Sequence, residues 1–189
     1  MNIAPVNNIN FGKKPVLECF VKTKDNKKFD ATLYKLDYKD PKDREEVRNN
    51  NFLADFRAHF LPFRKDVSGL NFYVLENNET NEIVSCAETS RRIKRYPLVE
   101  DGTYTNIESV RENKNYIDPF FSILGQIIKE GIEHYDRGIK ISDFYCDRKD
   151  MKKYKFSKKE DEFEWNLPER RFQETLSKVE LRNQISFYG

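Results

Sequence analysis

The residues best suited to bind a ligand through their own chemistry form a basic run, Ser90-Arg91-Arg92-Ile93-Lys94-Arg95. Guanidinium and ammonium groups gathered in this way can bind a phosphate group or RNA. A charge run is also what the solvated end of a strand looks like, because charged side chains usually lie at the surface. The sequence favours the solvated strand end and leaves phosphate binding as the alternative.

Nucleophilic and metal-binding side chains lack the spacings that catalysis or zinc binding requires. Ser90 and Ser122 have no nucleophile-elbow context of the form Gly-x-Ser-x-Gly, and neither has Cys146. No pair of thiols or imidazoles has metal-ligand spacing, so we expect no metal site and reduced, buried thiols in a cytoplasmic protein. The residues concerned are Cys19, Cys86, Cys146, His59 and His134.

The most regular element is a helix predicted over residues 119–137, followed by a buried strand over 139–146. Asp118 is a good N-cap, and Pro119 suits the first helical position, where no N–H partner is needed. Gly138 follows as the C-cap. One face of the helix is apolar at helical spacing and predicts core packing. Its residues are Phe120, Leu124, Ile127, Ile128, Ile132 and Tyr135.

Composition indicates one globular domain with a charged surface and an aromatic-rich core. The 189 residues include 35% charged and 14% aromatic residues, and 34 basic against 32 acidic residues leave a net charge of +2. This balance gives no bulk electrostatic argument for nucleic acid or an anionic membrane. No stretch approaches the roughly 20 apolar residues of a membrane span. We expect a flexible tail over residues 1–14 and a single domain over 15–189.

The order of the predicted elements indicates a mixed α/β (α+β) sheet with helices packed on its faces. Asn is a poor helix former, so the run Asn49–Asn51 weakens the first helix, and Asp101-Gly102 is expected to form a turn in a loop over 97–103. The expected elements are strands over 15–23 and 29–37, a helix over 40–60, a hairpin of strands over 71–76 and 83–93, a strand over 104–111, a short strand over 163–166, and a last helix from Pro168.

This order resembles that of the GNAT (N-acetyltransferase) superfamily over roughly residues 29–170. NFYVLE and NETNEIVSCAE resemble the family's second and third strands. The stretch IESVRENKNYIDPFFSILGQIIKEGIEHYDRGIKISDFYC resembles its fourth strand, cofactor loop, third helix and fifth strand, and MKKYKF falls at its tyrosine-containing segment. The resemblance implies a mostly antiparallel sheet, a parallel strand pair beside the long central helix, and helices on both faces.

The resemblance also implies acetyl-coenzyme A as cofactor, its pyrophosphate bound by backbone N–H groups at the start of the central helix. This chain departs from the family there, because Pro119 and Phe121 stand at the two glycine positions. Proline offers no N–H, phenylalanine is bulky where close backbone approach is needed, and Asp118 adds negative charge. The positions carried over as cofactor-binding are Tyr116, Phe120, Phe121 and Ser122.

The catalytic roles that the resemblance implies fall on a glutamate and a tyrosine. Glu108 matches the strand glutamate that acts through water as general base on the substrate amine. The matching general-acid position is Met151, whose thioether donates no proton. Tyr154 or Tyr145 would protonate the departing thiolate in its place only if the alignment slips. A solvated strand residue for Glu108 and packing roles for the tyrosines are the alternatives.

Three functions stay open on this basis. The first is an acyltransferase that acetylates a primary amine of a small molecule or protein, as a monomer or homodimer. The second is an inactive interaction module of the same fold, in which Phe120 and Phe121 fill the former pyrophosphate site. The third is an unrelated α+β protein, which a non-parallel arrangement of strands 104–111 and 139–146 would support.

Overall fold

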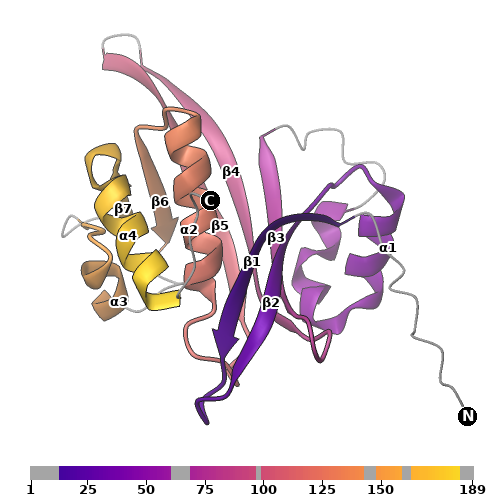
Figure 1. Ribbon diagram of the computed structural model, residues 1–189. Helices are drawn as coiled ribbons and strands as arrows, with labels where there is room; N and C mark the ends of the chain where they lie inside the picture. The colour runs from indigo at the N-terminus through magenta and orange to yellow at the C-terminus, as the bar shows by residue number, and fades with distance from the viewer. Residues whose placement is uncertain (1–12, 61–68, 97–98, 143–147, 159–162, 184–189) are drawn as a thin grey trace, which may run out of the picture.

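The computed structural model describes residues 13–60, 69–96, 99–142, 148–158 and 163–183. Within these ranges, seven strands form one sheet in chain order (Figure 1). Neighbouring strands are antiparallel, except that β5 and β6 run parallel. The strands are β1 (Lys14–Lys22), β2 (Lys28–Leu36), β3 (Leu70–Asn77), β4 (Ile83–Tyr96), β5 (Val99–Glu112), β6 (Gly138–Ser142) and β7 (Glu164–Pro168).

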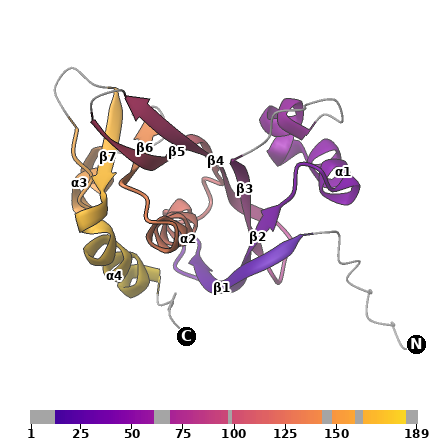
Figure 2. The same ribbon diagram turned by 90° about the horizontal axis from the view of Figure 1, so that it is seen from above.

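Helices cover both faces of the sheet, with α1 on one side and α2 and α4 on the other (Figures 1 and 2). The parallel pair beside the long helix confirms the expected fold class and removes the support for an unrelated α+β protein. No helix in the described ranges is long and apolar enough to cross a membrane. The helices are α1 (Pro41–Asn49), the 3-10 helix η1 (Asn51–Phe60), α2 (Phe120–Glu133), α3 (Arg148–Lys153), the 3-10 helix η3 (Glu169–Arg171) and α4 (Phe172–Asn183).

Each face of the sheet has its own apolar cluster, because successive side chains of a strand point to opposite faces. Tyr73 and Leu75 of β3 pack with α2, and the alternate residues Phe72 and Val74 pack with α1 and η1. The central helix contributes the predicted stripe, with Phe120, Leu124, Ile127 and Ile128 all buried.

The helix expected over 40–60 is interrupted inside the Asn49–Asn51 run. Asp40 caps α1 by accepting a hydrogen bond from the Lys42 N–H at 2.7 Å, with Pro41 at the first position. At Asn50 the backbone is extended, and its side-chain Oδ1 accepts from the Phe52 N–H at 2.9 Å. Asparagine side chains compete with the helix for backbone groups in this way, so the expected single helix becomes α1 followed by η1.

Both ends of the central helix differ from the prediction. Asp118 is not the N-cap, because its backbone lies in the left-handed region at φ +43° and Pro119 takes the cap position without a side-chain cap. The helix ends at Glu133, and Gly138 is the first residue of β6 rather than a C-cap. Tyr135 therefore lies beyond the helix and is 84% exposed instead of joining the core stripe.

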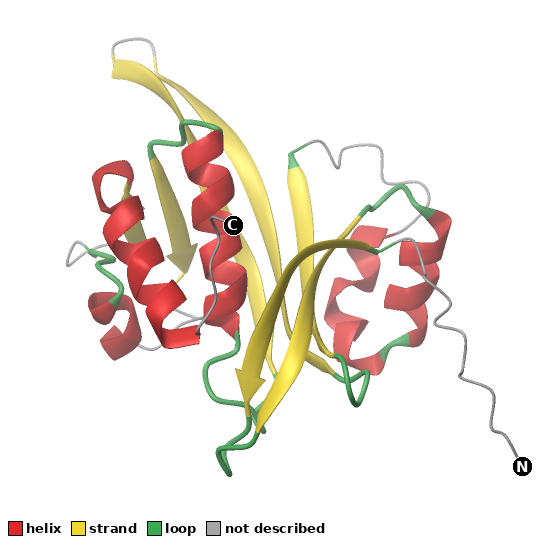
Figure 3. Cartoon of the chain, viewed as in Figure 1, coloured by secondary structure: helices red, strands yellow, loops and turns green. Residues whose placement is uncertain are grey.

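Two strand boundaries also differ, and one expected strand is described only in part. The turn expected at Asp101-Gly102 is wrong, because Tyr96 pairs with Val99 and the β4–β5 ladder runs on through Gly102. This ribbon extends past Ser90, where the pairing of β4 with β3 ends (Figure 3). Pro168 is the last residue of β7 instead of the first residue of the last helix, and η3 and α4 follow it. Residues 143–147 of the expected strand 139–146 lie outside the described residues, and these include Phe144, Tyr145 and Cys146.

Tyr135 holds a backbone conformation that glycine adopts at lower cost. Its φ is +56°, and the helix end is closed by the Asp136 N–H donating to the Gly131 carbonyl at 2.8 Å. We expect Tyr135→Gly to raise the free energy of unfolding by about 0.5–1 kcal/mol, because relief of about 1–2 kcal/mol of left-handed strain exceeds the extra chain entropy. Urea unfolding measures the change.

The matched control for this prediction is Leu181→Gly, at an equally exposed position inside α4. There glycine is expected to lower stability by about 1 kcal/mol, because helix propensity falls and no strain is relieved. A loss of stability in both variants would contradict the assignment of strain to Tyr135.

Candidate functional site

The candidate site lies where β5 separates from β6. Their parallel ladder runs from the pair Tyr104–Gly138 to the pair Ile107–Ile141, and within the described residues it ends there. The next residue of β5 is Glu108. The predicted base therefore stands at the point where the two strands part.

Glu108 is also the extra residue of a β-bulge. Thr89 of β4 pairs with Ile107, and the preceding Glu88 pairs with Ser109, so β5 has one extra residue, Glu108, between these two pairs. Bulges redirect side chains and are frequent beside active sites. The Ser90 hydroxyl donates a hydrogen bond to Glu108 Oε1, which holds the carboxylate in place.

A second carboxylate, that of Glu88, lies on the same face and was not predicted from the sequence. Glu88 precedes Ser90 by two residues, so both point to the α1 face of β4. Glu88 is 3% exposed and accepts a hydrogen bond from the Tyr38 hydroxyl at 2.9 Å. Beside it, Ser109 Oγ is buried with no hydrogen-bond partner among the described residues. The period-two pattern Glu88-Ser90 was the available signal in the sequence.

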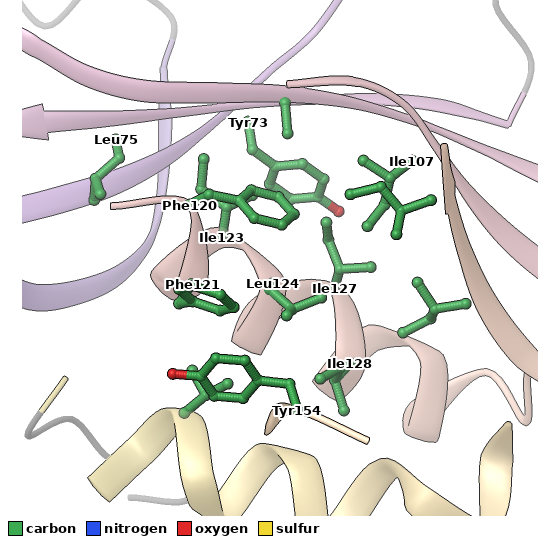
Figure 4. Packing of buried hydrophobic residues seen from close by; sticks show 14 of the residues in the cluster. Tyr73, Leu75, Ile107, Phe120, Phe121, Ile123, Leu124, Ile127, Ile128 and Tyr154 are labelled. Carbon is green, nitrogen blue, oxygen red and sulfur yellow. The ribbon is translucent and has the colours of Figure 1, made fainter. Parts of the chain in front are cut away.

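The predicted general acid does not lie on that face. Tyr154 belongs to the cluster on the α2 side and is fully buried. Its ring packs on that of Phe121, with 4.1 Å between the ring centroids (Figure 4). The structure therefore places Glu108 and Tyr154 on opposite faces of the sheet.

The candidate cofactor-binding residues at the start of α2 are side chains of the core. Phe120, Phe121 and Ser122 are 3%, 4% and 2% exposed. The Phe120 N–H donates to Glu112 Oε1 at 3.0 Å, and the Phe121 N–H donates to the Asp118 carbonyl at 3.3 Å. The negative charge at this helix end thus comes from Glu112, not from the expected Asp118 cap.

Tyr116, the fourth cofactor-binding candidate, links the loop before α2 to the β3–β4 hairpin. Its hydroxyl accepts from Asn77 Nδ2 at 3.1 Å and donates to Glu82 Oε2 at 3.0 Å. Burial raises the pKa of the Tyr116 hydroxyl, and the Glu82 carboxylate adds to the effect. Tyr116 is therefore a neutral hydrogen-bonding group at physiological pH.

The cysteines offer no reactive group within the described residues. Cys19 and Cys86 are free and buried, and Cys146 lies outside the described ranges. Burial raises the pKa of the Cys19 thiol to about 11, so the nucleophilic thiolate is scarce at neutral pH. Among the described side chains, no group of three histidine, cysteine, aspartate or glutamate residues could hold a metal ion.

Comparison with known proteins finds likeness at the level of structure. No family model matches the chain, and no curated protein matches it. A predicted acetyltransferase from Clostridium acetobutylicum, solved with acetyl-CoA, matches with a TM-score of 0.50 and 16% identity over 70% of this chain and 93% of its own. AtaTR bound with AcCoA matches with a TM-score of 0.50 and 11% identity over 76% of this chain and 96% of its own. The chain has the GNAT fold.

Proposed function

We propose that this chain is an acyltransferase that moves an acetyl group from acetyl-coenzyme A to a primary amine of a small molecule or protein. The observation that carries the proposal is the bulge that turns Glu108 out of the ladder where β5 leaves β6. A carboxylate at that point can accept the proton that the amine loses, directly or through one water. Ser90 orients it, and the orphaned Ser109 hydroxyl supplies a further polar contact.

Acetyl-coenzyme A would supply a thioester whose acyl carbon the amine attacks as the carbon–sulfur bond breaks. In this proposal Tyr154 donates a proton to the departing thiolate. Tyr154 lies on the opposite face of the sheet from Glu108, so in this proposal the thioester has to lie between β5 and β6, within reach of both faces. Because the Tyr154 ring is also buried against Phe121, the contact between these two residues has to open before the hydroxyl can act.

The start of α2 supports binding of an anion. The Phe120 N–H already donates to a carboxylate oxygen at 3.0 Å, so an anionic oxygen fits at the helix end, as expected from the helix dipole. Glu112 is an exposed residue. Its carboxylate can rotate away when a phosphate oxygen takes its place, and this competition would weaken cofactor binding.

The second candidate function is an interaction module of the same fold without a cofactor. The burial of Phe120 and Phe121 favours it, because their side chains fill the first turn of α2 where the family carries glycine. In this case Glu112 would cap the helix permanently.

Calorimetric titration with acetyl-coenzyme A separates the two candidates. We expect wild type to bind, and Glu112→Gln to bind about tenfold more tightly, because a negative charge near the pyrophosphate is removed. Glu133→Gln is the matched control, an equal charge change at the far end of α2, and its affinity should equal that of wild type. No binding by wild type or Glu112→Gln at about 1 mM would exclude the acyltransferase and leave the interaction module.

A further inference from the structure

A polar cavity lies at the other end of α2 from the candidate cofactor site. It has a volume of about 220 Å³ and is lined by residues of β2, β3, β4, β5 and the C-terminal half of α2. The helix has 14 residues, so its two ends are about 20 Å apart. The cavity is therefore separate from the first turn of α2, and neither proposed function uses it.

The carboxylates of this cavity already have partners. Glu130 accepts hydrogen bonds from the Tyr73 hydroxyl at 2.7 Å, from Gln126 Nε2 at 3.1 Å and from Lys35 Nζ at 3.1 Å. Burial of the Tyr73 hydroxyl raises its pKa, and Glu130 adds to the shift, so it stays a donor.

Asp136, the second carboxylate, is 1% exposed and equally well paired. Its Oδ1 accepts from Arg91 Nε at 3.0 Å and from Arg91 Nη2 at 2.8 Å, and its Oδ2 accepts from the Thr105 hydroxyl at 2.6 Å. The cavity consequently offers a ligand few free acceptors.

Donors, in contrast, remain available. Lys35 Nζ has three N–H groups, and among the described residues its only hydrogen-bond acceptor is Glu130. Nη1 of Arg91 has no partner in the described part of the chain, and the Asn71 amide and the His134 ring make no side-chain hydrogen bond there.

The cations are also the more accessible charges. The side chains of Lys35 and Arg91 are 30% and 32% exposed, against 18% for Glu130 and 1% for Asp136. The carboxylates lie behind the cations and hold them in position. Arg91 is fixed further by donating from Nη2 to the His134 carbonyl at 2.9 Å, so its guanidinium is preorganised.

We propose that this cavity binds a small metabolite through an oxyanion, a phosphate or a carboxylate, held between Lys35, Arg91 and Asn71. A fixed guanidinium and a nearby ammonium form the charge-assisted hydrogen bonds that such groups favour. The volume lies below the usual range of about 300–1,000 Å³ for drug-sized ligands, so the ligand is small. In this proposal Arg91, the second residue of the basic run that begins at Ser90, lines a binding cavity instead of lying at a solvated strand end.

Nuclear magnetic resonance titration of the full chain with inorganic phosphate and, separately, with succinate tests this site. We expect shifts of the backbone amides of Gly69, Arg91 and His134 with one of the two anions at millimolar concentration. Lys35→Gln should weaken binding about tenfold or more, because one charge-assisted hydrogen bond is lost. It leaves Glu130 paired with Tyr73 and Gln126, so the variant should fold.

Two further variants make the result specific. Asn71→Leu places an apolar side chain in the cavity and should also weaken binding, whereas Lys178→Gln, an equal charge change on α4, should leave it unchanged. Preference for phosphate or for succinate identifies the class of oxyanion. Absence of shifts with both anions at about 10 mM, or equal weakening by Lys178→Gln, would overturn the proposal. These outcomes are independent of acetyl-coenzyme A binding at the first turn of α2.

Discussion

Replacement of Asp136 by alanine is expected to lower the free energy of unfolding by about 3–5 kcal/mol. The carboxylate is 1% exposed and joins β4 to the turn after α2 through Arg91. Without it, among the described residues, the guanidinium keeps only the His134 carbonyl as acceptor, and the Thr105 hydroxyl loses the acceptor that it has there. A partly buried charge and a buried donor are then both left unsatisfied, which costs more than the ion pair itself contributes.

Urea unfolding followed by circular dichroism measures this loss. The matched control is Asp55→Ala, which removes an ion pair to Arg111 of similar length, 2.7 Å, from a carboxylate that is 77% exposed. We expect a change of about 1 kcal/mol or less there, because solvent screens exposed pairs. Equal losses in the two variants would show that burial does not set the strength of the Asp136 pair. The double variant Asp136→Ala/Arg91→Met should recover part of the loss.

The sequence predicted the parts of the fold that depend on local periodicity. The stripe from Phe120 to Ile128 specified α2, and the β-rich run that contains Tyr73 and Leu75, next to a short polar turn, specified β3. The boundaries failed where two local signals competed. Asp118-Pro119 has the composition of a helix start, yet the left-handed backbone at Asp118 turns that residue out of the cap position. Glu112, six residues earlier in the chain, supplies the carboxylate instead.

The candidate site was only partly predictable, for a different reason. Glu108 could be proposed from its place on a strand, but its bulge is a property of the register between β4 and β5, which neither strand specifies alone. The cavity residues Arg91 and Asp136 are 45 positions apart and meet only because β4 passes the end of α2. Contacts at such separation depend on tertiary packing, and a single sequence carries no direct signal for them.

Phe121→Ala is expected to lower the free energy of unfolding by about 3–5 kcal/mol. The side chain is 4% exposed and packs between two aromatic rings, that of Tyr154 at 4.1 Å and that of Phe120 at 6.0 Å between centroids. Alanine would remove this packing and leave a cavity beneath the first turn of α2. Thermal and urea unfolding measure the loss, and Phe163→Ala, at a side chain that is 75% exposed, should change stability by about 0.5 kcal/mol or less.

The result also bears on the choice between the two proposed functions. If Phe121 fills the first turn of α2 as part of the core, its removal should lower the free energy of unfolding far more than removal of Phe163. Coenzyme A could then reach the backbone N–H groups of that turn only by displacing packed side chains. A cost similar to that of Phe163→Ala would mean that the Phe121 ring leaves the core readily in solution. The first turn would then be open to an anion, and Tyr154, released from its contact with Phe121, could reach the thiolate as the acyltransferase proposal requires.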